Sequence, residues 1–304
     1  MKRDIISIEE LETKSIYAIL DLAGDIKSDK AKYADTLKGK SIGLIFQKPS
    51  NRTRVSFEIG MGQLGGHAIY LGPDEIAMGK RESVKDVAAV LSRYLNGIIA
   101  RTYKHDDVKD MARYATVPVI NGLSDRAHPC QALGDIFTIK EKFGSFKGIK
   151  LSYIGDGNNV LNSLMCAAAK VGLDMKIATP KGYRPAKELV TIAKSFAKAS
   201  GAKIEFSNDP KWAAKDADII YTDVWVSMGQ EKEANKRLKA FKNFQVNDNL
   251  LKLGKRKCLV MHCLPAHRGQ EITDSVMDSK NSIVYDQAEN RMHVQKAILL
   301  QLLK

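Results

Sequence analysis

Apolar runs alternate with stretches of helical periodicity along most of this 304-residue chain. The run 41–46 predicts a buried strand, and the stretch 53–65, which carries apolar residues at helical spacing, predicts a helix after it. In the first half, further strands are expected at 67–71, 97–100 and 117–120, and further helices at 8–26, 83–95, 105–115 and 129–143. This alternation favours a parallel sheet with helices on its faces.

The second half repeats the alternation from a new strand at 151–154, which leads into a helix at 159–170. Further strands are expected at 174–178, 203–206, 218–222, 258–261 and 283–285, and the terminal segment 294–303 is helical and apolar on one face. We predict an α/β fold of two doubly wound parallel-sheet lobes, with the active site in the cleft between them. The expected domains are residues 1–140, completed by the C-terminal helix 288–304, and residues 148–285.

Composition narrows the class of protein. The net charge of +13 suits either a nucleic acid or an anionic small molecule. The lysines are spread along the chain and no nucleic-acid-binding motif is present, so we expect no nucleic-acid partner. No apolar run reaches the length of a membrane span, and the first residues lack the apolar stretch of a secretion signal. The four cysteines lack metal-binding spacing, which predicts the reduced thiols of a cytoplasmic protein.

The stretch Ser50-Asn51-Arg52-Thr53-Arg54 lies between the first predicted strand and its helix. The first turn of a helix has unpaired backbone N–H groups and partial positive charge. Ser50 suits the N-cap position, and the guanidiniums of Arg52 and Arg54 can each bind two phosphate oxygens. This concentration of donors suits a phosphate site, and an ordinary cap followed by a solvated face is an equally good interpretation of the stretch taken alone.

A second turn, Gly155-Asp156-Gly157, also lies between a predicted strand and a helix, as in the dinucleotide fingerprint G-x-G-x-x-G. The third glycine position holds Val160, so the close helix–strand contact that glycine permits is missing. A nicotinamide-dependent dehydrogenase is therefore a rival with only a partial match. The same turn can instead present Asn158 or Asn159 to a ligand.

Further polar clusters lie at predicted strand ends or helix starts: His128-Pro129-Cys130-Gln131, Asp223 with Ser227-Met228-Gly229, His262-Cys263-Leu264-Pro265, and Glu289-Asn290-Arg291. Loops at the carboxyl ends of parallel strands line ligand sites, where a carboxylate can hold a substrate ammonium. Each cluster also has a structural explanation when taken singly. A loop histidine can serve only as a hydrogen-bonding group, a cysteine as a small buried side chain, and an arginine as a surface charge.

Together, these clusters and the 50–54 stretch resemble the transcarbamoylases, in order and spacing over about residues 5–304. The 50–54 stretch and His128-Pro129-Cys130-Gln131 are similar to those of all members that use carbamoyl phosphate. The segments Ser227-Met228-Gly229 and His262-Cys263-Leu264-Pro265 resemble the branch that uses ornithine, and they are the more specific.

The resemblance implies roles for individual residues. The implied carbamoyl phosphate site consists of Ser50, Asn51, Arg52, Thr53, Arg101, His128, Gln131, Cys263, Leu264 and Arg291. Of these, it makes Arg101, His128 and Cys263 catalytic, and it has Thr53 and Arg101 polarise the carbamoyl carbonyl. The implied ornithine site consists of Asn159, Asp223, Ser227 and Met228. It implies no metal and no other cofactor.

The reaction expected from the resemblance is carbamoyl transfer to the δ-amine of L-ornithine, which releases citrulline and phosphate. A transferase for another amine, such as putrescine or an acylated ornithine, is the nearest alternative, although Asp223 and Ser227 suit a free α-amino acid. The resemblance also implies a homotrimer or an assembly of trimers. One position departs from the family: Ala77 stands where a glutamine commonly reaches a neighbouring subunit's carbamoyl phosphate, so that contact is either lost or taken over by Lys80 or Arg81.

Overall fold

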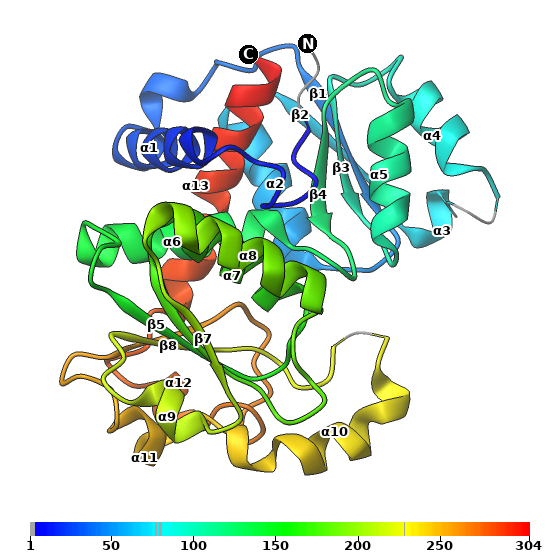
Figure 1. Ribbon diagram of the computed structural model, residues 1–304. Helices are drawn as coiled ribbons and strands as arrows, with labels where there is room; N and C mark the ends of the chain where they lie inside the picture. The colour runs from blue at the N-terminus through cyan, green and yellow to red at the C-terminus, as the bar shows by residue number, and fades with distance from the viewer. Residues whose placement is uncertain (1–3, 77, 79–80, 228) are drawn as a thin grey trace. The chain divides into compact units, whose positions relative to one another are not determined.

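The computed structural model describes residues 4–76, 78, 81–227 and 229–304. The chain forms two compact units: unit 1 is Met1–Phe137 with Asn290–Lys304, and unit 2 is Thr138–Glu289. Each unit contains a parallel sheet flanked by helices, as the sequence pattern predicts (Figure 1). No helix among the described residues is both long and apolar enough to cross a bilayer.

The sheet of unit 1 has the strand order β2-β1-β3-β4, and all of its neighbouring strands are parallel. Its strands are β1 (Ser41–Phe46), β2 (His67–Leu71), β3 (Gly97–Arg101) and β4 (Val119–Leu123). The central strand β3 is buried along its whole length, and β1 is buried except at its first residue. Such continuous burial is expected where helices cover both faces of a parallel sheet.

Helices pack on both faces of this sheet (Figure 1). The helices α4 and α5 cover one face, where Val87, Val108 and Met111 pack into one core cluster with strand residues Ile45 and Ile98. The helices of unit 1 are α1 (Thr13–Ser28), α2 (Asn51–Gln63), α3 (Pro73–Ile76), α4 (Val84–Leu91), α5 (His105–Tyr114), the first part of α6 (Pro129–Phe143) and the last part of α13 (Val284–Leu303), with a short 3₁₀ turn η1 (Ala31–Tyr33).

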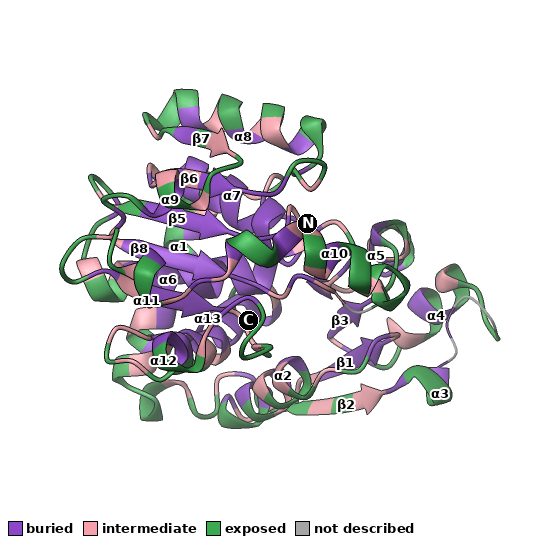
Figure 2. Ribbon diagram, turned by 90° about the horizontal axis from the view of Figure 1, so that it is seen from below, coloured by how far each residue is buried: buried purple, intermediate pink, exposed green. Residues whose placement is uncertain are grey.

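The sheet of unit 2 has the order β7-β6-β5-β8-β9, again with parallel neighbours. Its strands are β5 (Lys150–Ile154), β6 (Asp174–Ala178), β7 (Ile204–Ser207), β8 (Ile219–Thr222) and β9 (Leu259–His262). The strands β5 and β8 are buried along nearly their whole length (Figure 2). The further elements are α7 (Asn159–Val171), α8 (Lys187–Ser200), α9 (Pro210–Ala214), α10 (Ala234–Phe241), α11 (Asp248–Leu251), α12 (Asp274–Met277), and the 3₁₀ turns η2 (Glu231–Glu233) and η3 (Lys242–Phe244).

One predicted strand is wrong. Residues 283–285 were expected to form a strand, but only Ser282 makes an isolated bridge to Val260, and α13 begins at Val284. The terminal helix is therefore longer than the apolar pattern at 294–303 indicates, and Arg291 lies inside it rather than before it. The early turns of α13 carry buried polar residues such as Gln287 and Asn290, which hide the helical periodicity of apolar positions.

Candidate active site

In unit 1, the polar groups gather where the strand order reverses. β2 lies on one side of β1 and β3 on the other, which makes the boundary between β1 and β3 a topological switch point. Open parallel sheets bind ligands beyond the carboxyl ends of their strands at such points. β1 leads into Ser50 and α2, β3 ends at Arg101, and the loop after β4 ends at His128. The topology thus explains why residues far apart in sequence meet here.

The start of α2 has the features expected of an anion site. Ser50 is its N-cap in extended conformation, and its hydroxyl oxygen accepts from the backbone N–H of Thr53 over 3.3 Å. The Ser50 hydroxyl also donates to the Thr53 hydroxyl oxygen over 3.2 Å, and the Asn51 side-chain oxygen accepts from the N–H of Arg52. No acidic residue lies in the first turn of this helix. The positive end of the helix dipole is therefore not neutralised by its own first turn.

Two guanidiniums, those of Arg291 and Arg52, lie close enough to influence a third, that of Arg101. Arg291 donates from Nη2 to the Thr53 hydroxyl oxygen over 3.1 Å. The pKa of Arg101 is lowered to about 10, first because the side chain is buried and then because Arg291 and Arg52 repel its charge. Gly134 makes room for Arg291, since a Cβ there would lie 3.0 Å from the Arg291 Cγ. A bound dianion would attract all three guanidiniums and so offset the repulsion between them.

His128 and Gln131 lie one turn apart at the start of α6, and both are buried. The pKa of His128 is well below its ordinary value because burial disfavours the charged ring, with repulsion from Arg291 and Arg101 adding to it. The imidazole is therefore neutral near pH 7. Gln131 donates from Nε2 to Asp135 over 2.8 Å. Among the described residues, neither Gln131 Oε1 nor Arg101 Nε has a hydrogen-bond partner, although both atoms are buried. These two atoms are suited to a polar ligand.

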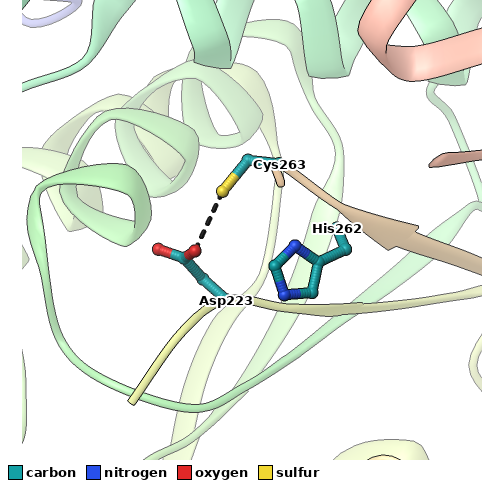
Figure 3. A group of neighbouring side chains, drawn as sticks. All are labelled: Asp223, His262 and Cys263. Carbon is teal, nitrogen blue, oxygen red and sulfur yellow. Dashed lines mark hydrogen bonds between the residues drawn. The ribbon is translucent and has the colours of Figure 1, made fainter. Parts of the chain in front are cut away.

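Unit 2 has a second switch point, between β5 and β8. Asp223 follows β8, and its two carboxylate oxygens accept from different neighbouring segments. The Cys263 thiol donates to Oδ1 over 2.9 Å (Figure 3), and Asn158 Nδ2 donates to Oδ2 over 2.7 Å. Asn158 follows β5 and also caps α7, because its Oδ1 accepts from the N–H groups of Val160 and Leu161. A fixed carboxylate at this edge suits an ammonium group.

The loop that carries Cys263 is held by a buried histidine–carboxylate pair. The Leu264 N–H donates to His262 Nδ1 over 2.8 Å, so the ring proton lies on Nε2, which donates to Glu271 over 3.1 Å. His262 and Glu271 have no exposed side-chain surface. Leu264 has a φ of 59°, which is uncommon for a residue with a side chain. The hydrogen bond to His262 stabilises that unusual conformation.

Asp223, His262 and Cys263 are the kinds of residue that bind metals, and one potential ligand atom of each lies within 4.8 Å of the others (Figure 3). The histidine does not fit that role here. Its Nδ1 lone pair accepts from Leu264, and its Nε2 proton points to Glu271. A metal ligand needs a ring nitrogen with an available lone pair. Within the trio, the Cys263 thiol donates to Asp223, while His262 holds the backbone of the next residue, Leu264.

Comparison with known proteins agrees with this division of the polar groups. Residues 3–141 match the family profile described as "Aspartate/ornithine carbamoyltransferase, carbamoyl-P binding domain", and residues 147–302 match its "Asp/Orn binding domain". The chain belongs to the aspartate/ornithine carbamoyltransferase family. The ornithine carbamoyltransferase of Archaeoglobus fulgidus is 54% identical over 99% of this chain and 97% of its own length.

Two further family members come from Pyrococcus furiosus. A curated relative named "Ornithine carbamoyltransferase, anabolic" is 54% identical over 98% of this chain and 95% of its own length. A solved structure titled as ornithine carbamoyltransferase from that organism has a TM-score of 0.96 and 52% identity. The match spans 99% of this chain and 97% of the chain in that structure. The resemblance that the sequence motifs indicate is thus confirmed over the whole chain.

The site residues expected from the family motifs fall into two groups. Unit 1 contains Ser50, Asn51, Arg52, Thr53, Arg101, His128, Gln131 and Arg291. Unit 2 contains Asn159, Asp223, Ser227, Cys263 and Leu264. Within unit 2, the hydrogen-bonded contact to Asp223 comes from Asn158, the N-cap, whereas Asn159 is the first residue of α7. Met228, Ala77 and Lys80 lie outside the described residues, and Arg81 is exposed.

The partial dinucleotide fingerprint has a structural explanation within this family fold. Gly157 packs against the chain's own backbone, because a Cβ there would lie 2.5 Å from the main chain of Arg184 and Pro185. Its N–H donates to the Tyr183 carbonyl over 2.9 Å. The loop 183–185 thus lies where a cofactor's pyrophosphate would approach this glycine. The motif fits the packing of unit 2 and gives no support to a dehydrogenase.

Sequence reasoning missed Glu271, which fixes the tautomer of His262, and it named Asn158 only as an alternative to Asn159. The N-cap preference for asparagine was a usable signal for Asn158, because an N-cap side chain lies at the strand-to-helix turn. No sequence signal was available for Glu271, since its contact depends on how the loop 263–270 returns to β9.

Proposed function

We propose that the protein transfers the carbamoyl group of carbamoyl phosphate to the δ-amine of L-ornithine, giving L-citrulline and phosphate. The observation that carries this proposal is the whole-chain match to ornithine carbamoyltransferases, over both the carbamoyl phosphate and the amino-acid-binding domains. The two switch-point sites agree with it in chemistry. One is a cluster of cations at a helix start, and the other is a fixed carboxylate.

In this proposal, the start of α2 holds the phosphate. Ser50, Asn51, Arg52 and Thr53 bind its oxygens, and Arg101 and Arg291 supply further positive charge. The support for these roles is the capped helix start and the repulsion that Arg101 experiences from Arg291 and Arg52. Phosphate becomes more negative as it leaves, so these cations also stabilise the departing group.

Two neutral side chains, a hydroxyl and one guanidinium act on the carbamoyl group. His128 and Gln131 bind its amide and oxygen, with Arg101 and Thr53 aimed at the carbonyl oxygen that gains charge in the tetrahedral intermediate. A preorganised donor of this kind contributes about 3–4 kcal/mol to transition-state stabilisation. A neutral His128 donates a hydrogen bond without adding a further cation to the cluster. Carbamoyl phosphate is already activated, so no protein nucleophile is required.

Ornithine is bound by unit 2 in this proposal. Asp223 pairs with its α-ammonium, Asn159, Ser227 and Met228 contact the amino-acid end and chain, and Cys263 lies near the reacting amine. Leu264 uses its backbone carbonyl to accept from the carbamoyl amide. Support comes from the hydrogen bonds that fix Asp223 and from the His262 contact that fixes the Cys263–Leu264 turn. Orienting two substrates for attack can lower a barrier by about 7–11 kcal/mol.

A direct assay tests the function. Purified protein is incubated with carbamoyl phosphate and L-ornithine at pH 8, and citrulline and phosphate are measured together. We expect the two products in equal amounts, and no citrulline would overturn the proposal. Putrescine, an N-acylated ornithine and aspartate serve as competing amines in the same assay. Ornithine should be preferred by a large factor, because Asp223 suits a free α-ammonium.

We place this reaction in the cytoplasm and in arginine biosynthesis, and the relative from Pyrococcus furiosus is named as an anabolic enzyme. We also propose that the chain forms a homotrimer or an assembly of trimers. Exposed apolar side chains support an interface on unit 1: Val55 and Ile59, one turn apart on α2, and Ile69 on the edge strand β2. Light scattering should give a mass of at least three 33.7 kDa chains, and a monomer would contradict this proposal.

A further inference from the structure

One buried arginine connects the two segments of unit 2 that supply residues to the ornithine site. Arg237 lies on α10 with 7% of its surface exposed. Its Nη1 donates to the Asp156 carboxylate over 2.8 Å and to the Trp225 carbonyl oxygen over 3.1 Å. Asp156 belongs to the turn after β5, and Trp225 to the loop after β8. One nitrogen atom therefore holds both segments.

These two segments are the ones that carry the polar groups of the site. Asp156 is two residues before Asn158, which donates to Asp223. Trp225 lies between Asp223 and Ser227, two residues from each. A shift of the Trp225 carbonyl away from Arg237 would therefore move Ser227 relative to Asn158. Arg237 thus links the turn that carries Asn158 to the loop that carries Asp223 and Ser227.

The surroundings of Arg237 are rigid and aromatic. Its guanidinium lies 5.1 Å from the centre of the Tyr183 ring, which packs edge-on against Phe241. The Trp225 ring stacks on Phe241 with centroids 5.8 Å apart. Asp156 is held from its other side, because its carbonyl accepts from the Tyr153 hydroxyl over 3.0 Å. A guanidinium surrounded by these rings has little freedom to move, so it keeps the Asp156 carboxylate and the Trp225 carbonyl at a fixed separation.

Stability alone does not explain why these charges are buried. Burial raises the pKa of Asp156 to about 6, even though Arg237 next to it acts in the opposite direction. The ionised carboxylate is thus costly at this place. Buried ion pairs commonly contribute less to stability than well-packed apolar pairs of the same size. What apolar side chains cannot supply is a directional bond to the Trp225 carbonyl.

We propose that Arg237 is a positioning residue for ornithine, which holds the Asp223–Ser227 loop against the Asp156 turn so that both sides of the amino-acid site keep their spacing. The inference rests on the proposed function, since it takes ornithine as the ligand of that site. It assigns to Arg237 no contact with substrate. The expected kinetic signature is a change in the KM for ornithine and not in the KM for carbamoyl phosphate, whose expected phosphate-binding residues lie in unit 1.

Three variants separate positioning from stability. Arg237→Met leaves Asp156 buried without its partner and should lower both the melting temperature and the affinity for ornithine. Asp156→Leu with Arg237→Met removes both charges, so the melting temperature should largely recover. The KM for ornithine should stay at least tenfold above that of the parent in this double variant, because the bond to the Trp225 carbonyl is still missing. Arg237→Lys keeps a donor and should retain most of the affinity.

Arg268→Met is the matched control. Arg268 also pairs with carboxylates, Asp274 and Asp278, but it is exposed and lies outside both segments. Its variant should leave both KM values within twofold of the parent. If the double variant regains the parent's KM for ornithine together with its melting temperature, Arg237 has only a structural role and the inference is overturned.

Tryptophan fluorescence can report the position of the Asp223–Ser227 loop in the absence of catalysis. The Trp225 ring is buried, and its Nε1 finds no acceptor in the described part of the chain, so its emission should respond to movement of the loop. In a Trp212→Phe background, Trp225 is the remaining tryptophan. We expect its emission maximum to shift in the double variant without any ligand, and titration with L-norvaline, which is ornithine without its δ-amine, should show at least tenfold weaker binding. Unchanged emission and unchanged binding would overturn the inference.

The two proposals fail in different ways. If the parent protein forms no citrulline, the proposed function is wrong, while the emission of Trp225 in the variants still reports whether Arg237 holds the loop. If the parent forms citrulline and the double variant has the parent's KM and emission, the function stands and the positioning role does not.

Discussion

Arg291 donates from its guanidinium to the hydroxyl oxygen of Thr53 over 3.1 Å, although the two residues are 238 positions apart in the chain. This contact joins the C-terminal helix α13 to the start of α2. Arg101 belongs to the same cluster: its pKa is lowered first by burial and then by repulsion from Arg291 and Arg52. The last helix of the protein therefore contributes a guanidinium to the proposed phosphate site near residue 50. The following predictions test this arrangement and its counterpart in unit 2.

Removal of Arg52 should weaken carbamoyl phosphate binding selectively. Arg52→Ala removes a cation that lies within the electrostatic range of Arg101. A hydrogen bond to a charged group contributes about 1.5–3 kcal/mol, which corresponds to about a 10–100-fold rise in the KM for carbamoyl phosphate. Arg54→Ala is the control, since Arg54 stacks on Tyr70 and pairs with Glu58. Steady-state kinetics should show less than a threefold change for Arg54→Ala, and equal effects of the two variants would refute the assignment.

His128 should not titrate in the working pH range. Its pKa is well below the ordinary value, so the ring stays neutral from pH 6.5 to 9. We expect the rate to rise toward alkaline pH because ornithine loses its δ-ammonium proton. This rising limb of the pH–rate profile therefore reflects the substrate and not His128. His128→Ala should lower kcat by about 100-fold, as for loss of an oxyanion donor, with the limb unmoved. A limb that shifts or vanishes in the variant would assign that titration to His128 instead.

The same lowered pKa makes a prediction for stability. The folded state binds a proton at His128 less readily than the unfolded chain, whose histidines titrate near pH 6.5. The stability contributed by the neutral ring is thus present above pH 6.5 and is lost as the pH falls below it. Denaturant unfolding between pH 5 and 7.5 should show a shallower pH dependence for His128→Gln than for the parent. Parallel curves would contradict the neutral buried ring.

Asn158 has two contacts, one that caps α7 and one that holds Asp223, and a substitution can remove the second while it keeps the first. Asn158→Ser keeps an N-cap for α7 but removes the amide that donates to Asp223. We expect a loss in unfolding free energy of less than about 1 kcal/mol, together with a roughly tenfold rise in the KM for ornithine. Asn247→Ser is matched to it, because the Asn247 side chain caps another helix, α11, by accepting from the Leu250 N–H. Similar ornithine kinetics in the two variants would show that the Asn158–Asp223 bond is unimportant.

Glu271 should fix the tautomer of His262. Without an acceptor at Nε2, as in Glu271→Ala, a buried N–H is left unpaired, at a cost of about 1–3 kcal/mol. The ring can then exchange tautomers, which removes the acceptor for the Leu264 N–H and loosens the Cys263 turn. Nitrogen chemical shifts of His262 should report a single Nε2–H tautomer in the parent and a mixture in the variant. Glu271→Gln keeps an oxygen acceptor and should retain most of the parent's tautomer and activity, and a single tautomer in Glu271→Ala would contradict this role.

Local patterns predicted much of the fold. The strand β1 and the helix α6 coincide with the predicted ranges 41–46 and 129–143, because a run of apolar residues and a proline start are local signals. The early turns of α13 were not predicted, and a strand was expected at 283–285 instead. Buried polar residues such as Gln287 carry no periodic signal, since their burial depends on partners such as the backbone of His262.

By itself, the sequence determined the alternation of strands and helices, the motif types, and membership of a family whose members share that spacing. Only the tertiary structure decided which strand ends are neighbours, because strand order depends on packing between residues far apart in the chain. That order places Asn158 beside Asp223, and Arg291 beside Thr53. Burial also comes from the fold alone. Burial keeps the His128 ring neutral, and it raises the pKa of Asp156 although Arg237 lies beside it.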